Sequence, residues 1–415
     1  MIIKSFYQKV IHRRGLVLKE KYNPLFSPVK LANGLTLNNR FVLSPMVTNS
    51  STSDGFITDD DLKYAARRSH SAPLQITGAA YVNRHGQLFE FGFSACKDED
   101  IPGLAKLAKV MKSEGAKAIL QLTHAGRFST HALNHFGYVY GPSEMILQSP
   151  FRHKVKALTI DQIKSIVNDY ALATKRAILA GFDGIEISSA QRLLIQTFFS
   201  TFSNQRQDDY GCQNLVNRSR FGLEIFEAIQ NVIYKYANNQ FILGFRATPE
   251  ETRGSQIGYQ IEEFMDFLDC ALDQANIDYL AIASWGHDVY KNKVRAAGQY
   301  QGQLITQVIH QNFRDRLPIM ATGGINTSEK ALEALENSDL IGASTPFIVD
   351  PEFVEKIKIG NDKQIRLKIA PEELSSLAIP SAAFKDIVPL MDYGESLPKE
   401  SRDLFRGLYQ KEGNK

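Results

Sequence analysis

Polar side chains follow a short apolar run within Ile185–Leu194, at the position where a buried parallel strand would end. Ser188 and Gln191 can each donate a hydrogen bond to a carbonyl oxygen of a substrate. Arg192 adds a positive charge that suits an anionic or carboxylated substrate, although a solvated or tail-paired arginine is the alternative. Leu193 has no proton to donate. Gln191, Ser188 and Arg192 are therefore the candidate catalytic residues.

Two loops have the residue types that bind phosphate groups. Gly323 and Gly324 come shortly after one apolar run, and Ser344 and Thr345 directly follow the next. Glycines let backbone N–H groups approach an anion closely, and the start of a following helix favours negative charge. A plain tight turn is the alternative for the Gly-Gly pair.

A single cation, Arg246, directly follows another apolar run. A charge fixed at that position would stabilise negative charge that develops on a bound group. Because buried arginines are nearly always paired, a structural ion pair is the alternative.

All these side chains follow short apolar runs, and such runs recur along the chain. They are Phe41–Leu43, Leu74–Thr77, Ala118–Leu122, Gly184–Ile187, Phe241–Phe245, Tyr279–Ile282, Ile319–Ala321 and Leu340–Ala343. Most are short enough to be buried strands, and segments with helical spacing separate them. One of these helices is expected to start with a capping box, Thr159 with Gln162.

This alternation of strands and helices predicts an α/β fold, a (β/α)8 TIM barrel with its site at the carboxyl ends of the strands. The runner-up is a doubly wound open sheet, but no G-x-G-x-x-G motif follows the first run. We expect an N-terminal extension over residues 1–24, the barrel over 25–355 and a C-terminal extension over 356–415. Apolar clusters at Leu374–Ile379 and Ile387–Met391 predict that this tail packs, over the site or at a subunit interface.

The bulk composition excludes several classes of function. A net charge of +3 is small for 415 residues, so we expect neither nucleic-acid nor membrane binding. Cys96, Cys212 and Cys270 are far apart and odd in number, so we expect no bound metal and no disulfide framework. Reduced cysteines and the absence of an apolar signal segment near the N-terminus favour a cytoplasmic protein.

Five spaced motifs occur in a fixed order along the chain: Leu25–Pro28, Ser44–Met46, Gln121–Arg127, Ser203–Gly211 and Asn217–Phe221. With these motifs the chain resembles the old yellow enzyme family, the FMN-dependent NAD(P)H oxidoreductases and ene-reductases. The resemblance extends over roughly residues 25–355, and the fourth motif, followed by the fifth, is the most specific.

The resemblance implies an FMN that lies across the strand ends. It assigns to the cofactor Ser44, Pro45, Met46, Ala79, Gln121, Arg246, Gly323, Gly324, Ser344 and Thr345. Gln121 would hydrogen-bond the pyrimidine edge of the flavin, and Arg246 would lie near N1 and the C2 carbonyl, where negative charge accumulates on reduction. The implied partners are NAD(P)H, a small-molecule acceptor and, as one option, a second copy of the chain.

The chain departs from the family pattern mainly on the substrate side. Where the family has His-x-x-His or His-x-x-Asn, this chain has Ser188 and Gln191, and Leu193 replaces the tyrosine that donates a proton. Val47 replaces the threonine or cysteine that tunes the flavin, and Thr345 replaces an arginine that contacts the phosphate.

Three hypotheses follow from these departures, and the first is an ene-reductase with another proton donor, such as Tyr81, His287 or Tyr290. The second is a reductase whose acceptor needs only hydride or electrons, such as a quinone, dioxygen or a partner flavoprotein. The third is an FMN-binding, non-catalytic sensor or subunit. An unrelated barrel enzyme that acts on a phosphate-bearing substrate is the alternative from another class. The sequence favours an FMN-dependent oxidoreductase reduced by NAD(P)H, with an unidentified acceptor.

Overall fold

The computed structural model describes residues 18–148, 152–380, 384 and 386–412. Of the N-terminal extension expected over residues 1–24, the part before residue 18 lies outside the described residues. The remaining part forms a short 3-10 helix, η1 (Glu20–Phe26), which packs against the barrel through Tyr22 and Leu25.

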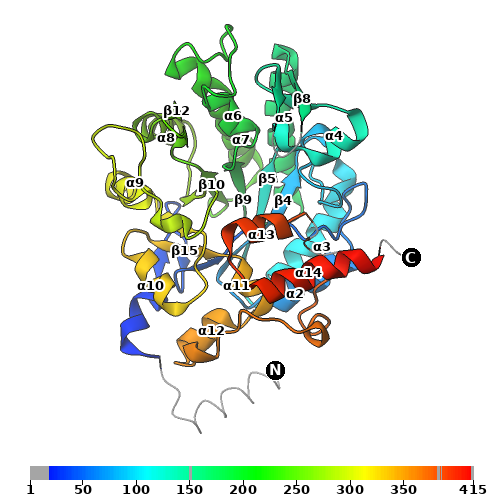
Figure 1. The fold of residues 1–415 in the computed structure, drawn as a ribbon, viewed down its shortest axis with the longest axis vertical. Coiled ribbons are helices and arrows are strands. Elements are labelled where there is room, and N and C mark those ends of the chain that lie inside the picture. The colour runs from blue at the N-terminus through cyan, green and yellow to red at the C-terminus, as the bar shows by residue number, and fades with distance from the viewer. Residues whose placement is uncertain (1–17, 149–151, 381–383, 385, 413–415) are drawn as a thin grey trace.

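Eight parallel strands close into a barrel in the order β10-β13-β14-β15-β3-β4-β5-β9 (Figure 1). They are β3 (Phe41–Leu43), β4 (Leu74–Tyr81), β5 (Lys117–Thr123), β9 (Gly184–Ser189), β10 (Ile242–Ala247), β13 (Tyr279–Ile282), β14 (Ile319–Thr322) and β15 (Leu340–Ala343). Each coincides with one of the predicted apolar runs, so the predicted barrel is confirmed and the open doubly wound sheet is wrong.

Helices surround the barrel and alternate with its strands (Figure 1). They are α2 (Asp59–Arg68), α3 (Ile101–Met111), α4 (Thr130–Phe136), α5 (Ile160–Leu179), α6 (Leu194–Phe199), α7 (Leu215–Tyr236), α8 (Ile261–Gln274), α9 (Ile305–Phe313), α10 (Ser328–Leu335), α11 (Thr345–Val349), α12 (Phe353–Lys358), α13 (Val388–Gly394) and α14 (Lys399–Glu412). The predicted capping box starts α5: the Thr159 N–H donates to Gln162 Oε1 at 2.9 Å, and the Gln162 N–H donates to Thr159 Oγ1 at 3.2 Å.

Short elements occupy the loops between these units. The remaining strands are β1 (Val29–Lys30), β2 (Thr36–Leu37), β6 (Val139–Gly141), β7 (Met145–Leu147), β8 (His153–Ala157), β11 (Glu251–Arg253) and β12 (Gln256–Tyr259). The other 3-10 helices are η2 (Arg84–Gly86), η3 (Asp98–Asp100), η4 (Gly126–Phe128), η5 (Val289–Lys291), η6 (Asp362–Gln364) and η7 (Pro371–Glu373).

The barrel strands are buried on both faces, which is why they read as apolar runs rather than as alternating patterns. Inside the barrel, Ile76, Ile119, Ile242 and Met320 form part of one apolar cluster. A larger cluster fills the layer between the strands and the outer helices. The interior is therefore packed below the strand ends, and the open space lies above them.

The C-terminal segment packs on the barrel, as its apolar clusters predict. Phe384 and Phe405 pack edge to face with ring centroids 5.2 Å apart, inside a cluster that joins this segment to the barrel. The buried guanidinium of Arg68 in α2 donates to the Leu377 carbonyl at 3.1 Å and to the Ile348 carbonyl at 2.8 Å. Figure 1 shows α13 and α14, in red, crossing the barrel.

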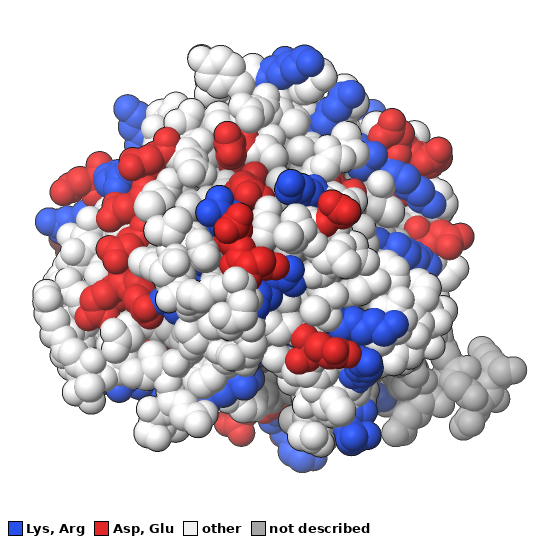
Figure 2. Space-filling model, turned by 90° about the horizontal axis from the view of Figure 1, so that it is seen from above, with Lys and Arg blue, Asp and Glu red and all other residues white. Residues whose placement is uncertain are grey.

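The surface carries both signs of charge. On the face seen in Figure 2, lysine and arginine side chains are interspersed with aspartate and glutamate. Within the described part of the chain, no helix has both the length and the apolar character that crossing a bilayer requires.

Candidate active site

One cavity opens at the carboxyl ends of the barrel strands, and most of the sequence-predicted site residues line it. They are Ser44, Pro45, Met46, Ala79, Gln121, Ser188, Gln191, Arg246, Gly323, Gly324, Ser344 and Thr345. Arg192, the remaining predicted residue, lines a second cavity instead, and Gln191 lines both. The topology therefore collects residues from seven separate loops and strand ends at one place, as expected for a barrel.

A buried hydrogen-bond network forms the floor of the cavity. Gln121 on β5 pairs in register with Glu186 on β9, and its amide Nε2 donates to Glu186 Oε1 at 2.7 Å. Tyr279 on β13 donates its hydroxyl to the other carboxylate oxygen at 3.0 Å. Because the amide nitrogen is engaged below, the amide oxygen of Gln121 is left to accept from a ligand above. Glu186 was not among the predicted site residues, since its place in an apolar strand gave no sign of a partner.

Arg246 stands beside this network with an unsatisfied donor. Its Nη1 is buried, and no group among the described residues accepts a hydrogen bond from it. Burial lowers the pKa of the Arg246 guanidinium, and the nearby Glu186 carboxylate opposes that shift. Burial also raises the pKa of the Glu186 carboxyl, and Arg246 opposes that shift in turn. Glu186 thus offsets the charge of Arg246 electrostatically, and the buried Nη1 without an acceptor points to an anionic ligand as a partner.

The Gly323–Gly324 pair turns the chain so closely that side chains are excluded. Both residues have left-handed backbones, with φ of +86° and +78°. A Cβ at Gly323 would lie 2.6 Å from the Cβ of Val289, and one at Gly324 would lie 2.8 Å from the Cα of Asp288. The tight-turn reading is therefore correct, and the same geometry leaves backbone exposed to the cavity for an anion.

At the opposite wall, Ala190 to Leu193 form a tight turn closed by the Leu193 N–H, which donates to the Ala190 carbonyl at 3.1 Å. Gln191 and Arg192, its two central residues, both have left-handed backbones, with φ of 57° and 63°. Such strain in residues other than glycine is most frequent at functional sites. The turn directs Gln191 and Leu193 to the main cavity, while Arg192 pairs with Glu251 at 3.6 Å beside the second cavity.

The alternative proton donors named from the sequence lie elsewhere. Tyr81 donates its hydroxyl to the Asp54 carbonyl at 3.2 Å, and Tyr290 donates to Glu333 at 2.7 Å. His287 is exposed beside Asp288. In the described part of the chain, none of Tyr81, Tyr290 and His287 lines either of the two cavities.

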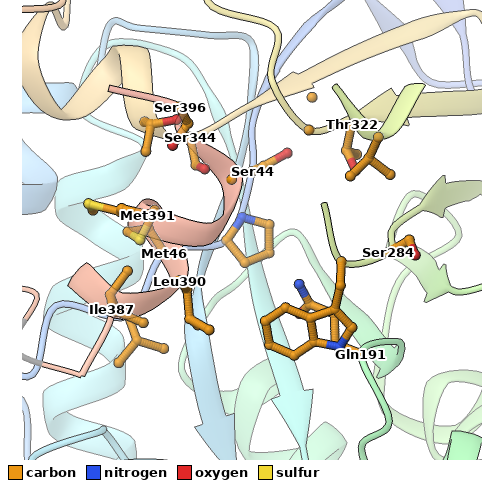
Figure 3. Close-up of a pocket in the computed structure, with 18 of the residues that line it drawn as sticks. Ser44, Met46, Gln191, Ser284, Thr322, Ser344, Ile387, Leu390, Met391 and Ser396 are labelled. Atoms are coloured by element: carbon orange, nitrogen blue, oxygen red, sulfur yellow. The ribbon is translucent and has the colours of Figure 1, made fainter. Parts of the chain in front are cut away.

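Residues of the C-terminal segment form a wall that the sequence did not assign to the site. Ile387, Leu390 and Met391 line the cavity on the side away from Gln191 and Ser284 (Figure 3). Tyr393 of α13 lines both cavities, and Trp285 after β13 does the same. The apolar pattern at Ile387–Met391 predicted packing, but no local signal says which surface a tail covers.

Comparison with known proteins agrees with this geometry. Residues 24–364 match the model of the NADH:flavin oxidoreductase / NADH oxidase family. The chain belongs to this family. It is 63% identical over 391 residues to an uncharacterised oxidoreductase of Streptococcus pyogenes, covering 94% of this chain and 98% of the relative. It is 32% identical to a probable NADH-dependent flavin oxidoreductase of Bacillus subtilis, covering 89% and 97% of the two chains.

Solved structures support the same grouping. Morphinone reductase in complex with tetrahydroNAD aligns with a TM-score of 0.68 and 25% identity, covering 89% of this chain and 96% of that one. The protein is thus an old yellow enzyme-type oxidoreductase with FMN as cofactor and NAD(P)H as reductant. The cavity fits FMN, because Arg246 Nη1 and the Gln121 oxygen offer a free donor and acceptor, and the Gly323–Gly324 turn leaves backbone open to a phosphate.

Proposed function

We propose that the main cavity holds FMN between the floor at Gln121 and Arg246 and the turn at Gly323–Gly324. FMN, when bound, takes hydride from NAD(P)H and delivers it to a second substrate. The Gln121 oxygen would accept from the pyrimidine edge, and the free Nη1 of Arg246 would donate where negative charge accumulates. Ser344 and Thr345, with the glycine turn, would surround the phosphate. This arrangement agrees with the roles implied by the family resemblance.

The acceptor that we propose is a quinone-type compound, bound against the wall made by Ser188, Gln191 and Leu193. The observation that carries this proposal is the chemistry of that wall: a hydroxyl and an amide can donate hydrogen bonds, but neither is an acid near neutral pH. Reduction of a quinone needs protons only at its oxygens, which water supplies. Reduction of an enone needs a proton at carbon, and Leu193 has none to give.

A second candidate is ene-reduction with Tyr393 as the proton donor. Its phenol is on α13, lines the cavity and is more than half exposed, so it has access to solvent protons. An NADH:acrylate oxidoreductase of Vibrio harveyi is 32% identical over 89% of this chain, although the match spans only 36% of that protein. Arg192 in the adjoining cavity is already paired with Glu251, so its charge adds no preference for an anionic acceptor.

The rates at which different acceptors reoxidise the flavin of the purified holoenzyme distinguish the two candidate functions. We expect NADH or NADPH to reduce the flavin anaerobically and benzoquinone to reoxidise it rapidly. Cyclohexenone and acrylate should reoxidise it about 10²-fold more slowly or worse, the usual contribution of a general acid. Rapid turnover of cyclohexenone or acrylate would favour the ene-reductase, and a flavin that neither nucleotide reduces would favour a sensor.

The substitution Tyr393→Phe tests the second candidate directly. If Tyr393 supplies the proton, the reaction with an enone or acrylate falls about 10²-fold, while flavin reduction by NAD(P)H and reoxidation by benzoquinone stay at the wild-type rate. Tyr234→Phe, at an exposed phenol on α7, is the matched control. Equal enone rates in wild type and Tyr393→Phe would exclude the phenol. A cytoplasmic location and assembly with a second copy of the chain stay predictions.

A further inference from the structure

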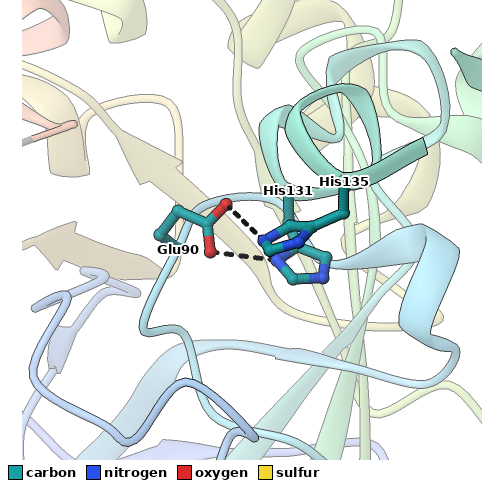
Figure 4. Close-up of side chains that lie close together, drawn as sticks. All are labelled: Glu90, His131 and His135. Atoms are coloured by element: carbon teal, nitrogen blue, oxygen red, sulfur yellow. Dashed lines mark hydrogen bonds and ion pairs between the residues drawn. The ribbon is translucent and has the colours of Figure 1, made fainter. Parts of the chain in front are cut away.

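Three side chains outside the flavin cavity converge on one point. His131 and His135 are one turn apart on α4, and Glu90 reaches them from the loop that follows β4 (Figure 4). Residues four apart on a helix share a face, so both imidazoles point the same way. None of the three lines the main cavity, although Leu88 and Phe89, directly before Glu90, do.

The three residues contact one another through their polar atoms. Glu90 Oε2 lies 2.9 Å from His131 Nδ1, and Glu90 Oε1 lies 3.4 Å from His135 Nε2. One ligand atom from each residue can be chosen so that all lie within 4.8 Å of one another. A tetrahedral zinc with bonds of about 2.0–2.2 Å holds its ligand atoms about 3.4 Å apart, so small side-chain rotations suffice.

Neighbouring residues hold His131 and the Glu90 loop in place, while His135 is open to solvent. His131 is almost wholly buried, so its imidazole is held in place against Glu90. Asn49 holds the loop by donating to the Glu90 carbonyl at 2.9 Å. The His135 side chain is 55% exposed, so water can complete the coordination.

A simple hydrogen-bonded pair accounts for only part of this arrangement. Glu90 and His131 satisfy each other, but His135 adds a second imidazole to the same carboxylate, with the two rings 4.1 Å apart. A divalent cation uses both rings in their neutral form and balances the carboxylate charge.

We propose that Glu90, His131 and His135 bind a divalent transition metal, with Zn²⁺ as the preferred ion. Two histidines and one glutamate are a ligand set that zinc uses in proteins, and water takes the fourth position. The ion would join α4 to the loop after β4, beside the flavin cavity but separate from it. The proposal is independent of which acceptor the enzyme reduces.

The test is zinc titration of the metal-free holoenzyme by calorimetry, with Co²⁺ absorption as a second probe of the ligands. We expect about one zinc per chain. His135→Ala and Glu90→Gln should each weaken binding about tenfold or more, the scale of losing part of a metal shell. Both substitutions suit the fold, because His135 is exposed and glutamine keeps the shape of Glu90.

The matched control is His70→Ala. His70 also lies beside a glutamate, with Nε2 3.6 Å from Glu352, but no second histidine joins that pair in the described structure. The control should bind zinc as tightly as wild type. Absence of zinc binding by wild type, equal affinity in His135→Ala and Glu90→Gln, or the same loss in His70→Ala would each overturn the proposal.

Discussion

At the scale of single residues, the buried charges beneath the flavin cavity matter most. Arg246 and Glu186 oppose each other's burial shifts, and Gln121 and Tyr279 satisfy the carboxylate oxygens. Arg246 lines the cavity, and its buried Nη1 has no acceptor among the described residues. A charge-assisted hydrogen bond from this atom to the flavin should therefore contribute to both cofactor retention and reduction potential.

We expect Arg246→Lys to lower FMN affinity about tenfold or more and to lower the flavin's reduction potential. Lysine keeps the positive charge beside Glu186 but loses the planar fork, and a hydrogen bond to a charged group is worth about 1.5–3 kcal/mol. FMN dissociation and a redox titration measure both effects.

The control for this experiment is Arg295→Ala, at an exposed arginine beside the second cavity. It should retain the wild-type occupancy and potential. An Arg246→Lys protein with unchanged affinity and potential would contradict the assigned role, and Arg246→Ala is less informative because it leaves Glu186 buried without a countercharge.

At the scale of elements, the end of β5 depends on a histidine that stays neutral. His124 is fully buried, its Nδ1 accepts from the Gly126 N–H at 3.1 Å, and burial lowers its pKa to about 3. In the unfolded chain the imidazole titrates near its ordinary value of about 6.5. The unfolded state therefore takes up a proton first on acidification, so stability falls between about pH 6.5 and pH 3.

We expect His124→Gln to make the unfolding free energy depend less steeply on pH within this window. The slope of the unfolding free energy should decrease by up to about 1.4 kcal/mol per pH unit within the window, because the titration is removed. Urea unfolding at several pH values measures it. His124→Asn should flatten the profile equally, and parallel profiles for wild type and both variants would contradict the shifted pKa.

At the scale of the whole molecule, the C-terminal segment and the barrel form one packed unit. Arg68 links them: it stacks 3.7 Å from the Tyr64 ring and donates to the carbonyls of Phe347, Ile348 and Leu377. Ile348 and Leu377 belong to the same apolar cluster as Met391 of α13, which lines the cavity, so Arg68 anchors the segment that supplies this wall.

We expect Arg68→Met to destabilise the protein and to loosen FMN. Each buried carbonyl left without a donor costs on the order of 1–3 kcal/mol, and three are affected. Thermal unfolding and limited proteolysis beyond residue 367 measure the loss. Arg316→Met is the control, because its exposed pair with Asp269 should contribute only about 0–1 kcal/mol and lies outside the C-terminal segment. If the Arg68→Met protein and the control had equal midpoints of thermal unfolding, Arg68 would not hold the C-terminal segment on the barrel.

The eight strands, the barrel that they form and most of the residues that line the flavin cavity could be predicted from the pattern of residue types. Fully buried strands are continuous apolar runs, and in a parallel barrel every residue that follows a run meets the others at one end. Gln121, Ser188 and Arg246 each lie at the end of such a run or directly after it, and for this reason they line one cavity. The spaced motifs indicated the family, and the family resemblance implied FMN as the cofactor.

Contacts that follow no periodic pattern could be found only in the folded protein. The partner of Glu186, the turn that separates Arg192 from Gln191 and the convergence of Glu90 with His131 and His135 all depend on loop conformations. The same holds for α13, because an apolar tail must cover some surface but its pattern does not say which. The periodicity of apolar residues predicts which face of an element is buried. It does not predict which other residues that face contacts, and a binding site depends on those contacts.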